Sequence, residues 1–179
     1  LQRSSRLLKE FPESASEALQ KAMIEEGIKL ELGVSLKKFN QLEENKTHIS
    51  YEMNGSLKHI ETTFLFLALG RSPFTSSLNL EKVGVELLPT GHINTNAFQQ
   101  TSCPNVYAAG DCAGPHEIVH IAIKQGETAA LHALGKKVRP INYDSLLTVV
   151  FTDPQLAVVG LSPAQLLKRG IEFLSASYP

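Results

Sequence analysis

The feature that most constrains this chain is an apolar run at residues 63–69, which ends at Gly70-Arg71-Ser72-Pro73. A run without polar alternation predicts a strand that is buried on both faces. Such strands occur in sheets that are covered by helices on both sides, because only a covered sheet keeps water from both faces. We therefore expect an α/β fold, with this run as one strand of its sheet.

The N-terminal third of the chain carries two kinds of periodicity. Apolar residues recur at spacings of three and four between Ser14 and Gly27, which predicts an amphipathic helix, and Ser14 and Glu17 have the spacing of a capping box. Beyond Gly27 the pattern alternates with a period of two, and Asn54-Gly55 is typical of a tight hairpin turn. The expected strands are residues 28–32, 34–36, 48–53 and 57–60.

The remainder of the chain predicts further helices and strands. A short helical turn follows Leu78, and Ser162-Pro163 opens a helix that ends at Gly170. The other expected elements are a strand at residues 105–109, a helix at 117–134, strands at 148–154 and 156–160, and a strand beginning at Ile171.

Composition excludes several classes of function. Seventeen Lys and Arg residues against eighteen Asp and Glu give a net charge of -1, with no basic block, so we expect no nucleic-acid partner. No apolar run approaches the ~18 residues that span a bilayer, so we expect a cytoplasmic protein without a membrane partner. Cys103 and Cys112 match neither a Cys-x-x-Cys pair nor a zinc set, and we interpret them as structural thiols. A disulfide between them would need a fold-back at Pro104-Asn105.

The segment with the clearest chemical content runs from Thr101 to Asp111 and precedes a predicted helix. A strand that ends in glycine lets the backbone come close to a ligand at Gly110. Asp111 follows at the sheet edge, where its carboxylate accepts hydrogen bonds from sugar-like hydroxyls. The helix then directs its first N–H groups at the same place, which favours an anionic ligand.

Thr101-Ser102 followed by Val106-Tyr107-Ala108-Ala109-Gly110-Asp111 resembles the second FAD fingerprint of the FAD-containing pyridine nucleotide-disulfide oxidoreductases. The resemblance implies that Asp111 binds the ribityl chain of FAD, with Gly110 close to the cofactor. It further implies that backbone N–H groups of His120, Ile121 and Ala122 face the N1–C2=O edge of the flavin. The helix dipole would there stabilise reduced flavin.

Two other segments are similar to landmarks of this family. Gly70-Arg71-Ser72-Pro73 resembles the Gly-Arg-x-Pro junction at which the nucleotide domain returns to the FAD domain, although Phe74 replaces the usual Asn. Residues 149–154 with 159–162 resemble the opening of the dimer-interface domain, which favours the larger, glutathione-reductase-like group of the family. Within it, residues 151–154 favour the dihydrolipoyl dehydrogenase or mercuric reductase subgroup.

The implied fold comprises parts of two doubly wound FAD- and NAD(P)-binding domains and the start of an α+β dimer-interface domain. The implied boundaries are 1–70 for the end of the NAD(P) domain, 71–143 for the end of the FAD domain and 144–179 for the start of the interface domain. A homodimer through the interface domain is the implied assembly.

The first residues bear on the choice between NADPH and NADH. Gln2 stands where NADH-using members of the family carry Glu, and no acid occurs between Leu1 and Lys9. A carboxylate at that place binds the 2′-hydroxyl of NAD and repels a 2′-phosphate. Arg3 and Lys9 lie where NADPH-using relatives place two basic residues, and Arg suits phosphate because its planar fork donates twice. We therefore expect NADPH, while a solvated basic loop remains the alternative.

The resemblance implies hydride transfer from NAD(P)H to FAD and electron transfer to a disulfide or other small-molecule substrate. The family's Cys-x4-Cys pair, both glycine motifs and its His-Glu dyad are absent from these residues, so we expect them before Leu1 and after Pro179. We therefore assign no catalytic residue here and expect this chain alone to be inactive. An FAD scaffold without disulfide chemistry stays open as an alternative.

A zinc hydrolase is a second alternative, because His116-Glu117-Ile118-Val119-His120 matches the His-Glu-x-x-His signature. Pro115 instead indicates that this segment begins a helix, and no third ligand has the usual spacing. We therefore assign no metal site. The remaining histidines are expected to be solvated, namely His48, His59, His92 and His132.

Overall fold

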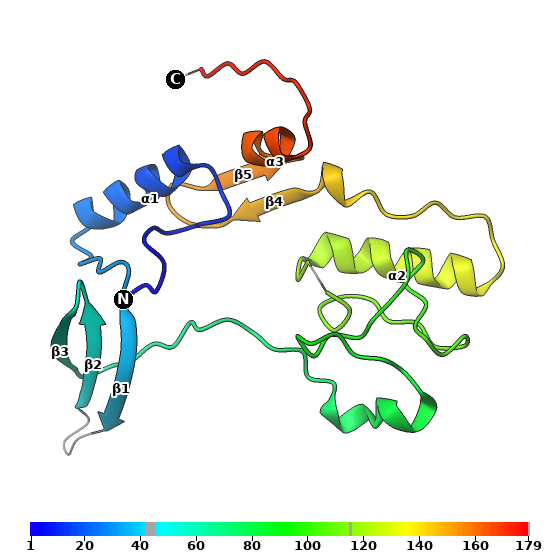
Figure 1. Ribbon diagram of the computed structural model, residues 1–179, viewed down its shortest axis with the longest axis horizontal. Helices are drawn as coiled ribbons and strands as arrows, with labels where there is room; N and C mark the ends of the chain where they lie inside the picture. Colours follow the sequence, from blue (N-terminus) through cyan, green and yellow to red (C-terminus); the bar gives the residue numbers. More distant parts are fainter. Residues whose placement is uncertain (42–45, 115, 179) are drawn as a thin grey trace. The chain divides into compact units, whose positions relative to one another are not determined.

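The computed structural model describes residues 1–41, 46–114 and 116–178, arranged in two compact units. One unit joins Leu1–Ala68 with Asp144–Pro179, and the other is Leu69–Tyr143. Figure 1 shows the helices and strands of each unit. None of the helices in the described ranges combines the length and the apolar character that crossing a bilayer requires.

A three-stranded antiparallel sheet lies in the first unit, in the order β1 (Ser35–Gln41), β2 (Thr47–Met53) and β3 (Ser56–Thr62). Asn54 and Gly55 connect β2 to β3 with φ of 52° and 74°, the positive values that a tight hairpin turn needs. The predicted hairpin is thereby confirmed. Its buried side packs Val34, Ile49 and Tyr51 into a small core.

Helix α1 (Glu13–Glu25) confirms the predicted amphipathic helix but not its predicted cap. Pro12 takes the N-cap position, so Ser14 lies inside the first turn and no side chain caps the helix. At the other end Gly27 has a φ of 87°, and the Ile28 N–H donates to the Met23 carbonyl at 2.9 Å. This is a Schellman ending, which glycine favours because it adopts positive φ without strain.

Residues 144–178 fold into a hairpin and a short helix. Strands β4 (Leu147–Val150) and β5 (Leu156–Val159) pair antiparallel, and helix α3 (Pro163–Lys168) begins with a capping box between Ser162 and Gln165. Arg169 donates to both carboxylate oxygens of Asp144, from Nη1 to Oδ2 at 2.6 Å and from Nη2 to Oδ1 at 2.9 Å. The Arg169 hydrogen bonds hold the pKa of Asp144 below its ordinary value.

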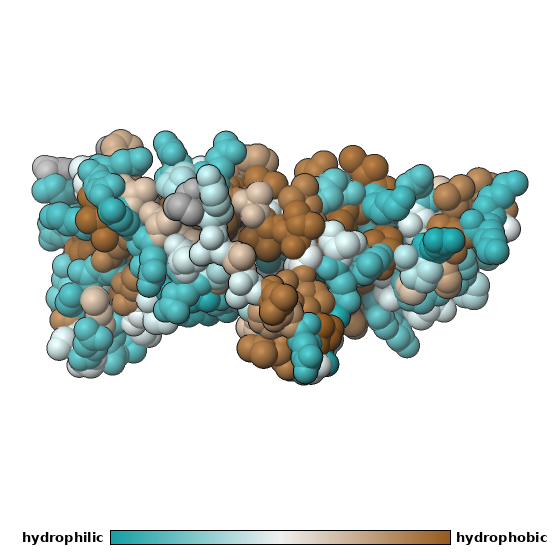
Figure 2. All heavy atoms as spheres, turned by 90° about the horizontal axis from the view of Figure 1, so that it is seen from above, coloured by the Kyte–Doolittle hydropathy of each residue, from teal (hydrophilic) through white to brown (hydrophobic). Residues whose placement is uncertain are grey.

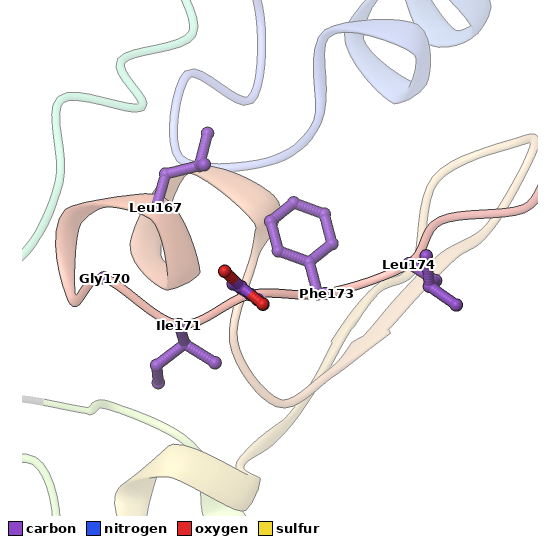
Figure 3. Close-up of a pocket in the computed structure, with 6 residues that line it drawn as sticks. Leu167, Gly170, Ile171, Phe173 and Leu174 are labelled. Carbon is purple, nitrogen blue, oxygen red and sulfur yellow. The ribbon is translucent and has the colours of Figure 1, made fainter.

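The strand expected from Ile171 is not formed. Ile171 and Phe173 point to opposite sides of the chain (Figure 3), whereas residues two apart in a strand point to the same side. No strand in the described ranges pairs with this tail, and an unpaired extended chain is no strand. A pocket between the tail and α3 is lined by Leu167 and residues 170–174. It contains none of the predicted cofactor residues.

The prediction for residues 63–69 is wrong in this structure. The segment forms no strand, and the side chains of Phe64 and Phe66 are 89% and 90% exposed. A strand buried on both faces needs a neighbour on each edge, and in the described parts of the chain nothing pairs with it. Figure 2 shows hydrophobic residues gathered on part of the surface in that view. The strand expected at residues 28–32 is also reduced to one parallel bridge, between Gln2 and Leu32.

The Leu69–Tyr143 unit contains little regular structure besides helix α2 (Val119–Ala133), which begins two residues later than expected. The predicted helical turn is present as two short 3-10 segments, η1 (Ser76–Leu78) and η2 (Leu80–Val83). The predicted strand at 105–109 is only a single bridge between Gln100 and Tyr107. The core of the unit consists of Val85, Ile93, Ala108 and Ala113.

Candidate cofactor site

The candidate site is built on the turn from Gly110 to Gly114. Gly110 has a φ of 84°, and a Cβ at this position would come within 3.4 Å of the Ala122 side chain. The Ala113 N–H donates to the Gly110 carbonyl at 2.9 Å, which closes the turn. Glycine is favoured here because its positive φ would strain any L side chain, whereas the contact with Ala122 alone would be an ordinary one. Asp111 is thus presented at the exposed side of the turn.

Asp111 is paired with Arg71, and both are predicted cofactor-site residues. Arg71 Nη1 lies 3.0 Å from Asp111 Oδ2, although the two residues are 40 positions apart. The side chains are 63% and 53% exposed, so both stay available to a ligand. Gly70, just before Arg71, is exposed and has a φ of 100°. The structure therefore brings Gly70, Arg71 and Asp111 into one region.

Sequence reasoning missed the second partner of Arg71. Arg71 Nη2 lies 2.7 Å from Glu117 Oε2 and also donates to the Glu117 carbonyl at 3.3 Å. Glu117 in turn lies 3.6 Å from His92 Nε2, while His92 Nδ1 bonds the Thr90 hydroxyl at 2.9 Å. One cation therefore joins two carboxylates, which keeps the net charge of the cluster negative while His92 is neutral.

The expectation that His92 and His132 are solvated is wrong. The His92 side chain is only 16% exposed, because its ring packs over Gly114. His132 is half-buried, stacks on Phe98 with ring centroids 4.8 Å apart, and bonds the Tyr107 hydroxyl at 2.9 Å. His59 is exposed as predicted, whereas His48 is half-buried and stacks against it.

The first turn of α2 carries the three other predicted site residues of this unit. Both the Ile121 and the Ala122 N–H donate to the Ile118 carbonyl, at 3.1 and 2.9 Å. His120 is exposed, and its N–H has no acceptor among the residues that the structure describes. Free N–H groups at a helix start favour a negatively charged or electron-rich ligand atom. Of the three, His120 thus has the N–H best placed for a ligand.

Gln125 is the most buried polar residue of the unit, and sequence reasoning did not select it. Its side chain accepts a hydrogen bond from the Gly110 N–H at 2.7 Å. The sequence feature that could have revealed Gln125 was its position four residues after Ile121, on the face of α2 that turns inward. A polar residue at such a position is uncommon unless its hydrogen bonds are satisfied.

The zinc-hydrolase alternative does not have the helix it requires. Helix α2 begins at Val119, so His116 and Glu117 precede it and His116 does not stand one helical turn from His120. His116 instead packs against the ring of Tyr143, and burial lowers its pKa below the ordinary value. Pro115, which indicated a helix start, lies outside the described residues. Within the described ranges, no group of three or more metal-ligating side chains converges.

The two cysteines are free thiols that pack against the core of this unit. The Val106 N–H bonds the Cys103 carbonyl, so the chain does fold back at Pro104 and Asn105. A disulfide is nevertheless absent. The interpretation of Cys103 and Cys112 as reduced thiols agrees with this arrangement.

The residues predicted to select NADPH lie in the other unit, in the loop at residues 1–11. The Gln2 backbone pairs with Leu32, and its side-chain oxygen accepts the Arg3 N–H at 3.0 Å. Arg3 is exposed, and its guanidinium has no partner among the described residues. The Lys9 ammonium lies 3.5 Å from the carboxylate of its neighbour Glu10 and has no other charged partner among the described residues. Arg6 holds the loop instead, by donating to the carbonyls of Leu8, Lys9 and Phe11.

A glycine turn that exposes a carboxylate beside the start of a helix is typical of proteins that bind a nucleotide cofactor. The chain belongs to the pyridine nucleotide-disulphide oxidoreductase family, whose sequence profile matches residues 1–126. Members of this family generally use FAD and a pyridine nucleotide.

Individual relatives agree with this assignment. The chain is 36% identical over 180 residues to a mercuric reductase of Bacillus cereus, covering 100% of this chain and 28% of that protein. It is 32% identical over 166 residues to a human mitochondrial dihydrolipoyl dehydrogenase, covering 92% of this chain and 32% of the relative. The solved structure of LpdA from Mycobacterium tuberculosis superposes with a TM-score of 0.78 at 28% identity, covering 88% of this chain and 33% of LpdA. The chain thus spans about a third of the length of these relatives.

Proposed function

We propose that the protein containing this chain is a flavoenzyme that passes a hydride from NADPH to FAD and electrons on to a disulfide or related acceptor. Mercuric reductase and dihydrolipoyl dehydrogenase, to which the chain is similar along its length, support this reaction type. We further propose that the protein is a homodimer and that residues 144–179 begin its interface domain.

The observation that carries the FAD assignment is the half-exposed carboxylate of Asp111 beside the first turn of α2. FAD offers ribityl hydroxyls that a carboxylate accepts, and a flavin edge whose charge a helix start stabilises. Gly110 leaves no side chain between the turn and Ala122, so the turn that carries Asp111 lies close to the first turn of α2. The residues present therefore fit FAD, which would supply the hydride acceptor.

The chain's own residues have three roles in this proposal. Asp111 accepts hydrogen bonds from the ribityl hydroxyls and so fixes the position of the cofactor. Arg71 neutralises part of the charge on Asp111 and Glu117, which lowers the cost of holding two carboxylates near a cofactor that gains electrons. The His120 N–H and the dipole of α2 favour negative charge at the flavin edge, which favours its reduced state.

Preference for NADPH is a further part of the proposal. No acid occurs in the sequence between Leu1 and Lys9 to repel a 2′-phosphate, and the exposed guanidinium of Arg3 is available to donate to it. Lys9, whose exposed ammonium lies 3.5 Å from Glu10, would add a second positive charge.

The test of the FAD site is Asp111→Ala in the intact protein. Removing a charged acceptor from a sugar hydroxyl should weaken FAD binding by about tenfold to a hundredfold. Glu81→Ala, which removes an exposed carboxylate on η2, is the matched control and should leave binding unchanged. The measurement is the Kd of FAD for the deflavinated protein. Equal affinity in Asp111→Ala and wild type would refute the assignment.

A further inference from the structure

Gln125 stands out because it is a long polar side chain without any exposed surface. It lies on the inward face of α2, together with Ile121, Thr128 and Ala129. Helical residues at these spacings normally bury apolar groups. A buried amide at such a place is costly unless its donors and acceptor are used, so its retention calls for a specific role.

The Gln125 amide makes three hydrogen bonds, two of them to the turn that presents Asp111 and one to Tyr143. Its Oε1 accepts the Gly110 N–H at 2.7 Å. Its Nε2 donates to the Gly114 carbonyl at 3.3 Å and to the Tyr143 hydroxyl at 3.0 Å. One side chain therefore closes both ends of the turn from Gly110 to Gly114 and ties the turn to the helix.

This tie adds to two other supports of the turn, namely the pairing of Arg71 with Asp111 and the Ile93 N–H, which donates to the Cys112 carbonyl at 2.8 Å. Inside the turn, the closing bond is that of the Ala113 N–H to Gly110, while the Gly114 N–H lies 3.4 Å from the Asp111 carbonyl. Gly110 itself is in a left-handed conformation, which a glycine leaves easily because alternative conformations are equally accessible to it. An external hydrogen bond to Gly110 therefore restricts the backbone that carries the carboxylate.

We propose that Gln125 is the positioning residue for Asp111, holding its carboxylate in place for the ribityl chain. This inference rests on the proposed FAD site. Gln125 does not touch the cofactor. It acts by fixing the residue that does, through the Gly110 N–H.

The first measurement is the FAD Kd of the deflavinated intact protein with Gln125→Leu, which has similar bulk but no amide. The Gly110 N–H then loses its acceptor, and FAD should bind about tenfold more weakly. Gln125→Glu keeps an oxygen toward Gly110 and should restore affinity to within about threefold. Ala129→Gly, on the same helix face, destabilises α2 without touching the turn and should leave the Kd unchanged. Should Gln125→Leu fail to fold, Gln125→Met replaces it.

The second measurement is the double variant Asp111→Ala with Gln125→Leu. If Gln125 acts through Asp111, the double variant should bind FAD no more weakly than Asp111→Ala alone. Additive losses would show that Gln125 supports the fold in general and would overturn the proposal. Hydrogen exchange of the Gly110 N–H provides a readout without FAD, and it should be faster in Gln125→Leu and slow again in Gln125→Glu.

The results separate this inference from the proposed function. An unchanged Kd in Gln125→Leu, combined with weaker binding in Asp111→Ala, overturns the positioning role and leaves the FAD site standing. Unchanged binding in Asp111→Ala overturns the FAD site and the positioning role together.

Discussion

The two regions that carry the predicted cofactor residues are organised in different ways. In the Leu69–Tyr143 unit, Arg71 reaches Asp111 and Glu117 over 40 and 46 positions of sequence. In the loop at residues 1–11, among the described residues the Lys9 ammonium pairs only with the adjacent Glu10, and the guanidinium of Arg3 has no partner. The first region is preorganised before a ligand arrives, whereas the second presents free positive charge. Preorganised sites lose less entropy on binding, so the two regions should respond differently to substitution.

The largest effect should come from Gly110→Ala, which tests the preorganised region. An L-residue in the left-handed conformation costs about 1–2 kcal/mol, while the new methyl group would only touch the Ala122 side chain at 3.4 Å. The free energy of unfolding should fall by about that amount, and FAD affinity should fall with it.

Gly126→Ala is the matched control for this prediction. Gly126 lies inside α2, where a Cβ meets nothing within 4 Å, so alanine should stabilise the helix by up to about 1 kcal/mol. Urea denaturation of both variants measures the difference. Equal stability in the two would show that the turn is not constrained as described.

A smaller effect is expected from Arg3→Ala, which tests the other region. If the free guanidinium binds a 2′-phosphate, kcat/KM for NADPH in the intact enzyme should fall about tenfold while NADH is unaffected. Arg6→Ala offers a contrast, because Arg6 holds loop carbonyls and its loss should impair both cofactors alike. Substantial use of NADH by the wild type, or an unchanged cofactor ratio in Arg3→Ala, would contradict the NADPH proposal.

The smallest effect concerns pH. Burial holds the pKa of His116 below its ordinary value of 6.5, so the unfolded chain binds this proton more readily than the folded chain. The associated stability is present above pH 6.5 and is lost as the pH falls through that value toward the folded pKa.

His116→Phe tests this dependence, because it keeps a ring against Tyr143 and removes the titration. The difference in unfolding free energy between pH 7.5 and 5.5 should therefore be smaller in His116→Phe than in wild type. An unchanged pH dependence would show that other groups cause it.

The sequence predicted those features that depend on local chemistry. Asn54-Gly55 specifies its hairpin because both residues adopt positive φ, and Ser162-Pro163 opens α3 because its capping groups lie within three residues. The predicted cap of α1 was wrong for a similarly local reason, since Pro12 takes the cap position that Ser14 was expected to fill.

The features that sequence reasoning missed depend on distant partners. Gln125 contacts Gly110, Gly114 and Tyr143 across 11 to 18 positions, and no periodic pattern reveals such an arrangement. Residues 63–69 were misjudged for the complementary reason. An apolar run indicates that a segment is stable only when other groups cover it. Whether a neighbouring strand lies beside the segment is decided by the tertiary fold.

The exposed run at residues 63–69 also has a consequence for how this polypeptide behaves in the cell. An apolar, uncharged stretch with exposed Phe64 and Phe66, which pairs with no strand in the described ranges, has the composition that stacks into intermolecular β-structure. Until a neighbouring strand covers it, the segment is a point for self-association and a natural target for chaperones that hold unfolded chains. Gatekeeper charges flank it at Glu61 and Arg71, where they oppose such stacking during synthesis.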